Sequence, residues 1–199
     1  MPPSQSTRSP GKESLKGLVL AGGKGSRLRP LTATGAKQLV PVANRPVIFY
    51  ALEQMVAAGI TDIGIITGDT SAQVEQALGD GSQFGARFTF IHQEAPLGLA
   101  HAVMTARPFL GDSAFCMFLG DNFLEHGIAP FAKRFCQNGA SAEILLKRVS
   151  NPAAVGVAVL DAAGHIMQLI EKPTTPISNL AVIGVYFFGP EIHEITERL

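Results

Sequence analysis

The sequence predicts an α/β protein in which a doubly wound, Rossmann-like sheet, mixed but mostly parallel, is flanked by helices. Apolar runs of strand length alternate with helical patterns from residue 18 to residue 137. That order places a helix between successive parallel strands. The run at 115–119 is apolar throughout, as expected of a strand covered on both faces. After residue 140, strand patterns follow one another without helices, so we expect the sheet to be mixed.

The elements of the first part follow from local residue patterns. The apolar run at 18–20 is long enough for a buried strand and too short for a helix. A helix is expected to open at Arg45-Pro46, because proline at the first helical position gives up only an N–H that has no partner there. Gly59 should end that helix, and Pro108 a later one. The other elements predicted here are strands at 62–67, 87–92 and 115–119 and helices at 71–78, 98–106 and 128–137.

The end of the chain predicts strands joined by short turns. The expected elements are strands at 143–149, 156–160, 165–171 and 181–188, a hairpin turn at 161–164 and a helix from 191 to the last residue. Residues 1–14 hold three prolines and no large aliphatic residue after Met1, which is typical of a disordered leader. We therefore expect a leader at 1–14 and one domain at 15–199.

Composition argues against several classes of partner. Lys plus Arg and Asp plus Glu each number 16, so no overall charge attracts nucleic acid or an acidic membrane. No apolar run approaches the roughly 20 residues of a membrane span, and no signal-peptide pattern is present. Cys116 and Cys136 lie in apolar settings, which favours reduced, buried thiols over a disulfide. These features predict a soluble, cytoplasmic protein with no nucleic-acid or membrane partner.

Small residues follow the first strand within the stretch from residue 18 to residue 41. They are Ala21, Gly22, Gly23 and Gly25. Backbone N–H groups of such a loop can approach an anion closely because no large side chain intervenes. Arg27 and Lys37 add positive charge, so the stretch predicts a phosphate site. For the glycines alone, an ordinary strand-to-helix turn with two solvated cations remains an alternative.

The spacing of this loop excludes two common phosphate motifs. A dinucleotide fingerprint would need a third glycine where Leu28 stands, and a Walker loop would need Ser or Thr after Lys24, where the chain has Gly25. The pattern L-A-G-G-x-G-S-R-L-x-P followed by K-Q-L-V-P instead resembles the signature of the sugar nucleotidyltransferases. The Lys-Gln pair at 37–38 favours the branch similar to glucose-1-phosphate thymidylyltransferases. Further motifs shared with that family stand at 93–100 (QEAPLGLA), 119–122 (LGDN), 171–173 (EKP) and 179–186.

The resemblance implies a nucleotide-diphospho-sugar transferase fold with a role for each motif. It implies a nucleotide-binding half at about 15–140 and a sugar-binding half at about 141–199. The implied nucleotide-binding residues are Leu20, Ala21, Gly22, Gly23, Gly25, Ser26, Arg27, Gln93, Pro96 and Gly98, of which Gln93 and Gly98 read the base. Arg27 and Lys37 are the implied catalytic residues, and Asp121 holds Mg²⁺. The implied sugar-phosphate residues are Gly156, Glu171, Lys172 and Val182.

The implied reaction joins dTTP and glucose 1-phosphate to give dTDP-glucose and pyrophosphate. A sugar phosphate has its second pKa at about 6, so its oxygen can attack the α-phosphorus in line without a general base. The protein must supply positioning and positive charge on the phosphoryl oxygens, which suits Arg27, Lys37 and Mg²⁺. Gln93 suits discrimination of a base edge by hydrogen bonds.

Three alternatives stay open from the sequence. The triphosphate can be UTP or another nucleotide, and the sugar can be another hexose phosphate. In the family a second metal carboxylate lies in a W-x-D-T-G segment that this sequence does not contain. The chain is therefore expected to be a truncated domain with an incomplete sugar half, and a nucleotide-binding module with an incomplete active site is the third alternative. Assembly with further copies of the chain is left open.

Taken singly, each site motif has a plain structural alternative. Asp121 lies where a turn commonly follows a strand, Gln93 in what could be an exposed loop, and residues 171–172 at a strand end. The five histidines show no metal-ligand spacing and are expected to be structural or solvated. The functional interpretation rests on the joint occurrence of the motifs in one order.

Overall fold

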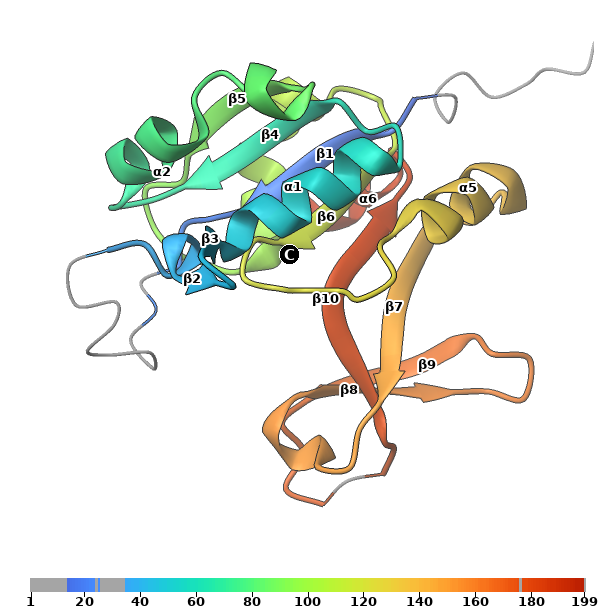
Figure 1. The fold of residues 1–199 in the computed structure, drawn as a ribbon. Coiled ribbons are helices and arrows are strands. Elements are labelled where there is room, and N and C mark those ends of the chain that lie inside the picture. Colours follow the sequence, from blue (N-terminus) through green and yellow to red (C-terminus); the bar gives the residue numbers. More distant parts are fainter. Residues whose placement is uncertain (1–13, 24, 26–34, 176, 199) are drawn as a thin grey trace, which may run out of the picture.

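The computed structural model describes residues 14–23, 25, 35–175 and 177–198, and Figure 1 shows their arrangement. Strand β1 (Lys16–Leu20) lies within the sheet, with β4 (Asp62–Thr67) and β6 (Phe115–Leu119) parallel to it on its two sides. Strand β5 (Arg87–His92) pairs in parallel with β4. The predicted leader at 1–14 lies outside the described residues except for its last residue.

Antiparallel strands extend the sheet beyond β6. Strand β10 (Leu180–Phe188) pairs with β6 through its second half and with β8 (Gly156–Leu160) through its first residues. Strand β9 (Ile166–Glu171) forms a hairpin with β8, and β7 (Ala142–Arg148) pairs along the length of β10. The order β5-β4-β1-β6-β10-β8-β9, with β7 on β10, makes eight strands among the described residues. Because β10 belongs to both parts, it carries the β8–β9 hairpin away from the helices (Figure 1).

Helices cover both faces of the parallel strands, which is the doubly wound arrangement that the sequence predicts. Consecutive residues of β1 show this, because Leu18 and Val19 are fully buried in two different hydrophobic clusters. The cluster around Val19 includes residues of α1 (Val47–Ala57), α2 (Ser71–Leu78) and α5 (Ala129–Asn138). The cluster around Leu18 includes residues of α3 (Leu99–Thr105) and α4 (Arg107–Leu110), with α6 (Ile192–Thr196) packed at its edge.

The structure corrects two predictions made from prolines. Arg45-Pro46 does not open α1 but forms strand β3, which pairs with β2 (Pro41–Val42) in a two-stranded hairpin. Ala43 and Asn44 form its turn with φ of 48° and 63°, as the favoured two-residue hairpin turns require. Pro108 does not end a helix, because α3 already stops at Thr105 and Pro108 stands in the first turn of α4.

Other helices differ from the predictions in their bounds by a few residues, or were not predicted at all. The last helix, expected from 191 to 199, is limited to Ile192–Thr196. In the described part of the chain, three short 3₁₀ helices have no counterpart in the predictions, namely η2 (Lys37–Leu39), η3 (Ser82–Phe84) and η4 (Pro152–Ala154). The thiol prediction is confirmed for Cys116, which is free and fully buried. Burial raises the pKa of that thiol far above its usual range.

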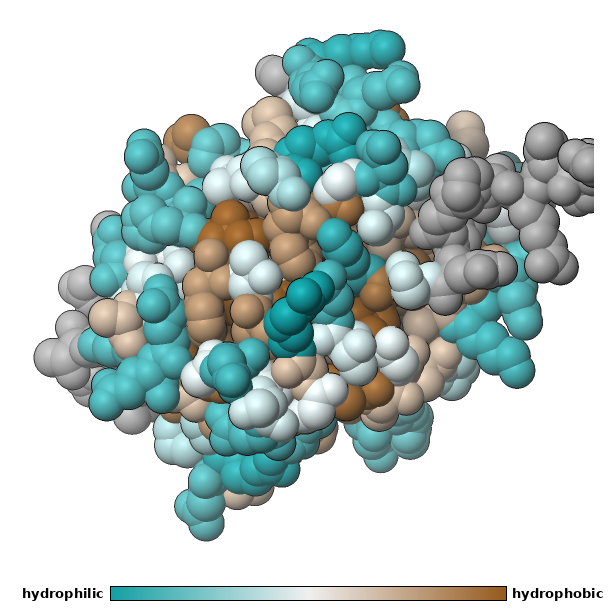
Figure 2. Space-filling view, turned by 90° about the horizontal axis from the view of Figure 1, so that it is seen from above, coloured by the Kyte–Doolittle hydropathy of each residue, from teal (hydrophilic) through white to brown (hydrophobic). Residues whose placement is uncertain are grey.

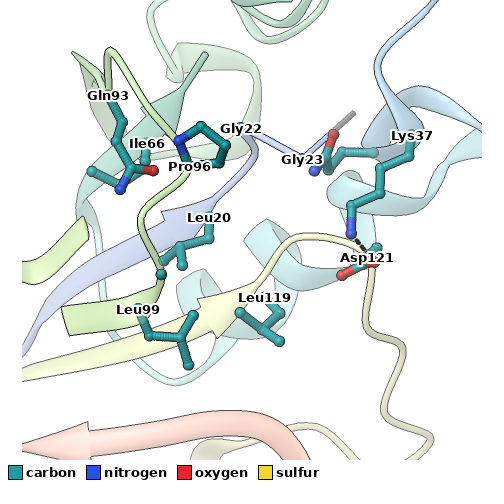
Figure 3. A pocket seen from close by; sticks show the side chains of 12 residues that line it. Leu20, Gly22, Gly23, Lys37, Ile66, Gln93, Pro96, Leu99, Leu119 and Asp121 are labelled. Carbon is teal, nitrogen blue, oxygen red and sulfur yellow. Dashed lines mark hydrogen bonds and ion pairs between the residues drawn. The ribbon is translucent and has the colours of Figure 1, made fainter. Parts of the chain in front are cut away.

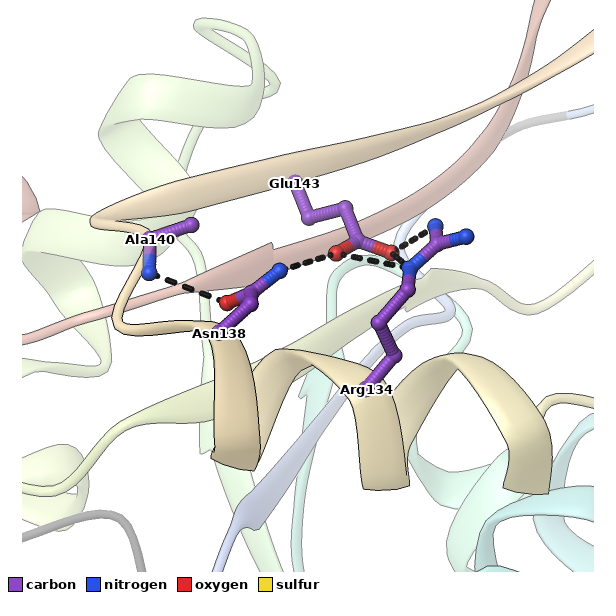
Figure 4. Close-up of polar contacts among 4 residues, drawn as sticks. All are labelled: Arg134, Asn138, Ala140 and Glu143. Atoms are coloured by element: carbon purple, nitrogen blue, oxygen red, sulfur yellow. Dashed lines mark hydrogen bonds and ion pairs between the residues drawn. The ribbon is translucent and has the colours of Figure 1, made fainter.

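A polar cluster joins α5 to β7 where the chain leaves the α/β part (Figure 4). Glu143 accepts hydrogen bonds from Nε of Arg134 at 3.1 Å and from Nδ2 of Asn138 at 3.1 Å. The Asn138 side chain in turn accepts a 2.9 Å bond from the backbone N–H of Ala140. The hydrogen bond and charge of Glu143 raise the pKa of Arg134. The cluster therefore links the end of α5 to the second residue of β7.

The surface mixes hydrophilic and hydrophobic residues. Viewed from above, hydrophobic residues gather near the middle of the face and hydrophilic residues surround them (Figure 2). Among the described residues, large side chains of β9 are exposed, with Met167 at 69% and Leu169 at 51%. None of the described helices is both long enough and apolar enough to cross a membrane.

Acidification from pH 7 to pH 5 is expected to destabilise the protein through His193. This side chain is buried, and its Nε2 has no hydrogen-bond partner among the described residues. Burial, and next the charge of Arg107, lower the pKa of His193 in the folded state. The unfolded chain therefore takes up a proton first, near its ordinary pKa of about 6.5. The stabilisation by the neutral ring is complete above that pH and is lost as the pH falls toward the lowered folded-state pKa.

Urea unfolding at pH 7 and pH 5 measures this effect. The His193→Gln variant should lose less free energy of unfolding between the two pH values than the unchanged protein. His126→Gln is the control, because the His126 side chain is 88% exposed. An identical pH dependence for His193→Gln and the unchanged protein would contradict the assignment.

Candidate active site

A cleft opens at the carboxyl ends of β1, β5 and β6, where ligands bind in open α/β sheets. Its volume is about 190 Å³. Gly22 and Gly23 follow β1, Gln93 follows β5, and Asp121 follows β6. Backbone hydrogen bonds hold these strand ends together, since Ala21 donates to the carbonyl of Ile66 at 2.7 Å. The predicted loops therefore share one site because their strands are neighbours in the sheet.

The two ends of the cleft differ in chemistry (Figure 3). At one end, Nζ of Lys37 lies 2.5 Å from Oδ2 of Asp121, and both side chains are only partly exposed. At the other end lie Gln93, Pro96 and Ile66, so that end is apolar with one amide group. Gly22 and Gly23 line the cleft between the ends. The arrangement suits an elongated ligand with a flat polar ring at one end and anionic groups at the other.

Gly23 lies close to the end of the Lys37 side chain, which a side chain at position 23 would displace. A Cβ added to Gly23 would lie 2.6 Å from Cε of Lys37. The absence of a side chain therefore lets the lysine stem pass close to the loop. Lys37 itself is held by η2, which contacts α1. A cation is thus placed over the loop backbone by a rigid element.

Gln38 is a site residue that sequence reasoning missed. It lines the cleft and is 1% exposed, and its Oε1 has no hydrogen-bond partner among the described residues. A buried acceptor without a partner costs about 1–3 kcal/mol, so a ligand that donates a hydrogen bond there would be favoured. The Lys-Gln pair in the sequence was a usable signal. Other lining residues not predicted are Ile66, Leu99 and Leu119.

A second cleft, of about 530 Å³, adjoins the first. The two share Leu99 and Leu119 as lining residues. Gly156 and Glu171 from the β8–β9 hairpin line the second cleft, together with Val182 of β10. Because β10 connects β6 to β8, residues far apart in sequence lie close to the first cleft.

Tyr186 also lines the second cleft. Burial, and next the charge of Glu171, raise the pKa of Tyr186. Its hydroxyl therefore stays protonated at neutral pH and can both donate and accept hydrogen bonds.

The predicted site residues fall into groups by their place in the structure. Those that line the first cleft are Leu20, Gly22, Gly23, Lys37, Gln93, Pro96, Gly98 and Asp121. Ala21 is fully buried behind the loop, and Gly25 is described but lies outside the lining. Ser26 and Arg27 lie outside the described residues.

Lys172 is the one predicted sugar-phosphate residue that does not line the second cleft. Its Nζ lies 3.1 Å from Oε1 of Glu171, and its backbone has the unusual φ of 43°. A residue other than glycine with left-handed backbone angles is strained, and such residues are commonly found at functional sites. Through this ion pair its ammonium lies beside Glu171, which does line the second cleft.

Among the described residues that line the first cleft, Asp121 alone offers a carboxylate to a metal ion. Among the described residues no group of three or more His, Cys, Asp or Glu side chains could hold a metal. Mg²⁺ usually takes one or two carboxylates, with waters and substrate phosphates completing its shell. A single carboxylate at the end of β6, beside a glycine loop open to phosphates, fits that donor set.

The fold and the cleft define an α/β protein of the doubly wound class, with a cleft at the carboxyl ends of its parallel strands. The chain belongs to the nucleotidyl transferase family, whose profile matches residues 16–199. It is 56% identical over 186 residues to the glucose-1-phosphate thymidylyltransferase of Streptomyces antibioticus. It is 52% identical over 180 residues to that of Streptomyces griseus. These matches cover 93% and 90% of this chain but only 52% and 51% of the relatives, so the chain spans about half their length.

Solved structures agree with this assignment. A Bacillus anthracis protein assigned as a glucose-1-phosphate thymidylyltransferase, crystallised with sucrose, superposes with a TM-score of 0.89 at 36% identity. That match covers 94% of this chain and 76% of the other. A UDP-glucose pyrophosphorylase in complex with UDP-glucose superposes with a TM-score of 0.80 at 26% identity, covering 92% and 79%. The predicted fold class is confirmed.

Proposed function

We propose that the protein transfers a nucleotidyl group from dTTP to glucose 1-phosphate, which gives dTDP-glucose and pyrophosphate. The observation that carries the proposal is the pairing of two adjoining clefts. One has a cation and a glycine loop, and the other is lined from the β8–β9 hairpin. Two relatives named glucose-1-phosphate thymidylyltransferase are more than 50% identical to this chain over nine-tenths of its length. The nucleotide is assigned to the first cleft and the sugar to the second.

The chain's own residues suit an in-line displacement. The phosphate oxygen of glucose 1-phosphate forms a bond to the α-phosphorus while the bond to the β-phosphate oxygen breaks, and pyrophosphate leaves. Lys37 supplies positive charge at the reacting phosphate, and Arg27 is assigned to the departing pyrophosphate from its motif. Because the attacking oxygen is already ionised at neutral pH, catalysis depends on positioning and charge stabilisation.

Mg²⁺ is the proposed cofactor, held by Asp121 together with substrate phosphates. When bound, it neutralises phosphoryl charge. The ion pair with Lys37 occupies the Asp121 carboxylate in the described structure. The ion pair uses Oδ2, which leaves Oδ1 of the same carboxylate for the metal ion.

The sugar phosphate is assigned to the second cleft. Glu171 offers carboxylate oxygens to sugar hydroxyls, while Gly156 and Val182 leave room for the ring. The hydroxyl of Tyr186 is a further partner there. Lys172 is assigned to the phosphate. A cytoplasmic location is part of the proposal, in keeping with the free thiol of Cys116.

A screen of pyrophosphate release by the full-length protein against each triphosphate and sugar phosphate tests the function. We expect the highest rate with dTTP and glucose 1-phosphate, a modest decrease with UTP, and weak activity with ATP or GTP. Two hydrogen bonds from Gln93 to the base, at about 1 kcal/mol each, predict that Gln93→Ala weakens dTTP binding about 10- to 100-fold. Gln137→Ala, at an exposed position on α5, is the matched control.

Calorimetry with dTTP and Mg²⁺ separates the alternatives. Binding of dTTP without pyrophosphate release from any pair would identify a nucleotide-binding module instead of an enzyme. Equal binding of ATP and dTTP would disprove base recognition by Gln93. Absence of triphosphate binding would disprove the proposed function as a whole.

A further inference from the structure

A histidine outside the predicted site contacts Gln93, whose amide group lies at the apolar end of the first cleft. His101 lies in α3, and its Nδ1 is 2.7 Å from Nε2 of Gln93. Both side chains are half-buried. The backbone around the pair is also held, since the N–H of Gln93 donates to the carbonyl of Thr67 at 2.8 Å. The hydroxyl of Thr105 donates to the carbonyl of His101 at 2.8 Å.

The chemistry of the two groups determines the direction of this hydrogen bond. An amide nitrogen only donates, so Nδ1 of His101 must accept. This hydrogen bond requires the tautomer that carries its proton on Nε2. In this arrangement the amide nitrogen of Gln93 is tied to α3, and turning the amide over would require the imidazole proton to move from Nε2 to Nδ1 or the bond to be lost.

We propose that His101 is a positioning residue that holds the Gln93 amide in the orientation selecting thymine or uracil over cytosine. With one N–H of Gln93 donated to His101, its second N–H and its Oε1 remain for a ligand. Thymine and uracil present an N–H at position 3 beside a carbonyl oxygen, which matches an acceptor beside a donor. Cytosine presents the opposite pattern at those two atoms, an acceptor at N3 beside an amino group.

The imidazole is needed to fix the Gln93 amide, because a glutamine side chain by itself does not strongly favour either of the two orientations of its amide group. The last torsion of a glutamine side chain is broad and roughly two-fold, so both orientations are accessible where neighbours do not choose between them. Without the acceptor on α3, Gln93 can turn over and present the pattern that suits cytosine. The inference rests on the proposed function, because it assumes that Gln93 faces the base of the bound triphosphate.

Two substitutions of His101 with opposite expected results test the inference. His101→Leu keeps bulk and removes the acceptor. It should weaken dTTP binding about 5-fold, the effect of one hydrogen bond, and narrow the preference for dTTP over CTP at least about 10-fold. His101→Asn places an amide oxygen near the position of Nδ1 and should restore most of the preference. Met104→Leu on the same helix, where Met104 is 37% exposed, is the matched control.

Calorimetry with dTTP and CTP on the full-length protein gives the binding ratios, and steady-state kinetics gives a second measurement. In the leucine variant, KM for dTTP should rise while kcat at saturating dTTP stays close to that of the unchanged protein, because no reacting atom is touched. The ¹⁵N spectrum of the His101 ring should show Nδ1 unprotonated in the ligand-free protein.

Each result decides a separate point. An unchanged ratio of dTTP to CTP affinity in His101→Leu, with dTTP still bound, would overturn the role of His101 and leave the proposed function intact. A protonated Nδ1 would overturn the stated direction of the hydrogen bond. If the unchanged protein bound neither dTTP nor UTP, the proposed function itself would fail.

Discussion

Replacing Lys37 with alanine is expected to lower kcat about 100- to 1,000-fold while the fold remains intact. Removing one preorganised electrostatic contact to developing charge typically has an effect of this size. Among the described residues, Lys37 is the cationic side chain that lines the first cleft, and it belongs to η2. Its partner Asp121 is 34% exposed at the side chain, so water can solvate the carboxylate when the ammonium is removed. Stability should therefore change little.

Steady-state pyrophosphate release and thermal unfolding of the same preparations measure both quantities. Lys133→Ala is the matched control, because it removes an exposed lysine of α5 away from the cleft. The Arg27→Ala variant should resemble Lys37→Ala, an expectation that rests on the sequence motif alone. Turnover of Lys37→Ala within a few-fold of the unchanged protein would show that this lysine does not act on the reacting phosphate.

Replacing Gly184 with alanine is expected to destabilise the protein by about 2–6 kcal/mol. Gly184 lies in β10 with φ of 69°, in the segment where the register with β7 shifts. An added Cβ would lie 2.2 Å from Nδ2 of Asn122 and 2.7 Å from Cδ1 of Leu119. Backbone strain and overpacking each contribute roughly 1–3 kcal/mol. The amide of Asn122 donates to the carbonyl of Ile183, so the clash also disturbs the junction between the two clefts.

Gly139→Ala separates the two causes. Gly139 has φ of 70°, and an added Cβ there would meet nothing within 4 Å. Its alanine variant should therefore show the backbone strain alone, with a smaller loss in urea unfolding than Gly184→Ala. Equal losses for the two variants would exclude a contribution from the contact with Asn122 and Leu119.

Local patterns predicted most of the secondary structure. The strands at 62–67, 87–92 and 115–119 and the helix at 71–78 have the bounds predicted for them. The spacing of apolar residues, the length of an apolar run and the glycines beside it are all local features, so they can be identified directly in the sequence. The predictions based on Pro46 and Pro108 were wrong because contacts with a neighbouring segment determine the structure at both residues. Pairing with β2 keeps Pro46 in a strand, and α3 ends before Pro108 is reached.

The site was predictable to the extent that its residues stand in motifs. Residues in loops after strands could be assigned to one sheet edge from the alternation of elements, because parallel strands end on the same side. Gln38 and His101 were not predicted. The burial of Gln38 and the contact of His101 with Gln93 arise from packing between elements.

By itself, the sequence determined the fold class, the order of elements in the α/β part, the family and the loops that carry charge. All of these follow from short-range pattern and motif. Only the tertiary structure decided that Lys37 meets Asp121 across 84 residues and that β10 pairs with both β6 and β8. It likewise decided that residues 156, 171 and 182 form a cleft beside Leu119. The physical reason is that strand pairing and burial between distant segments depend on how the whole sheet packs.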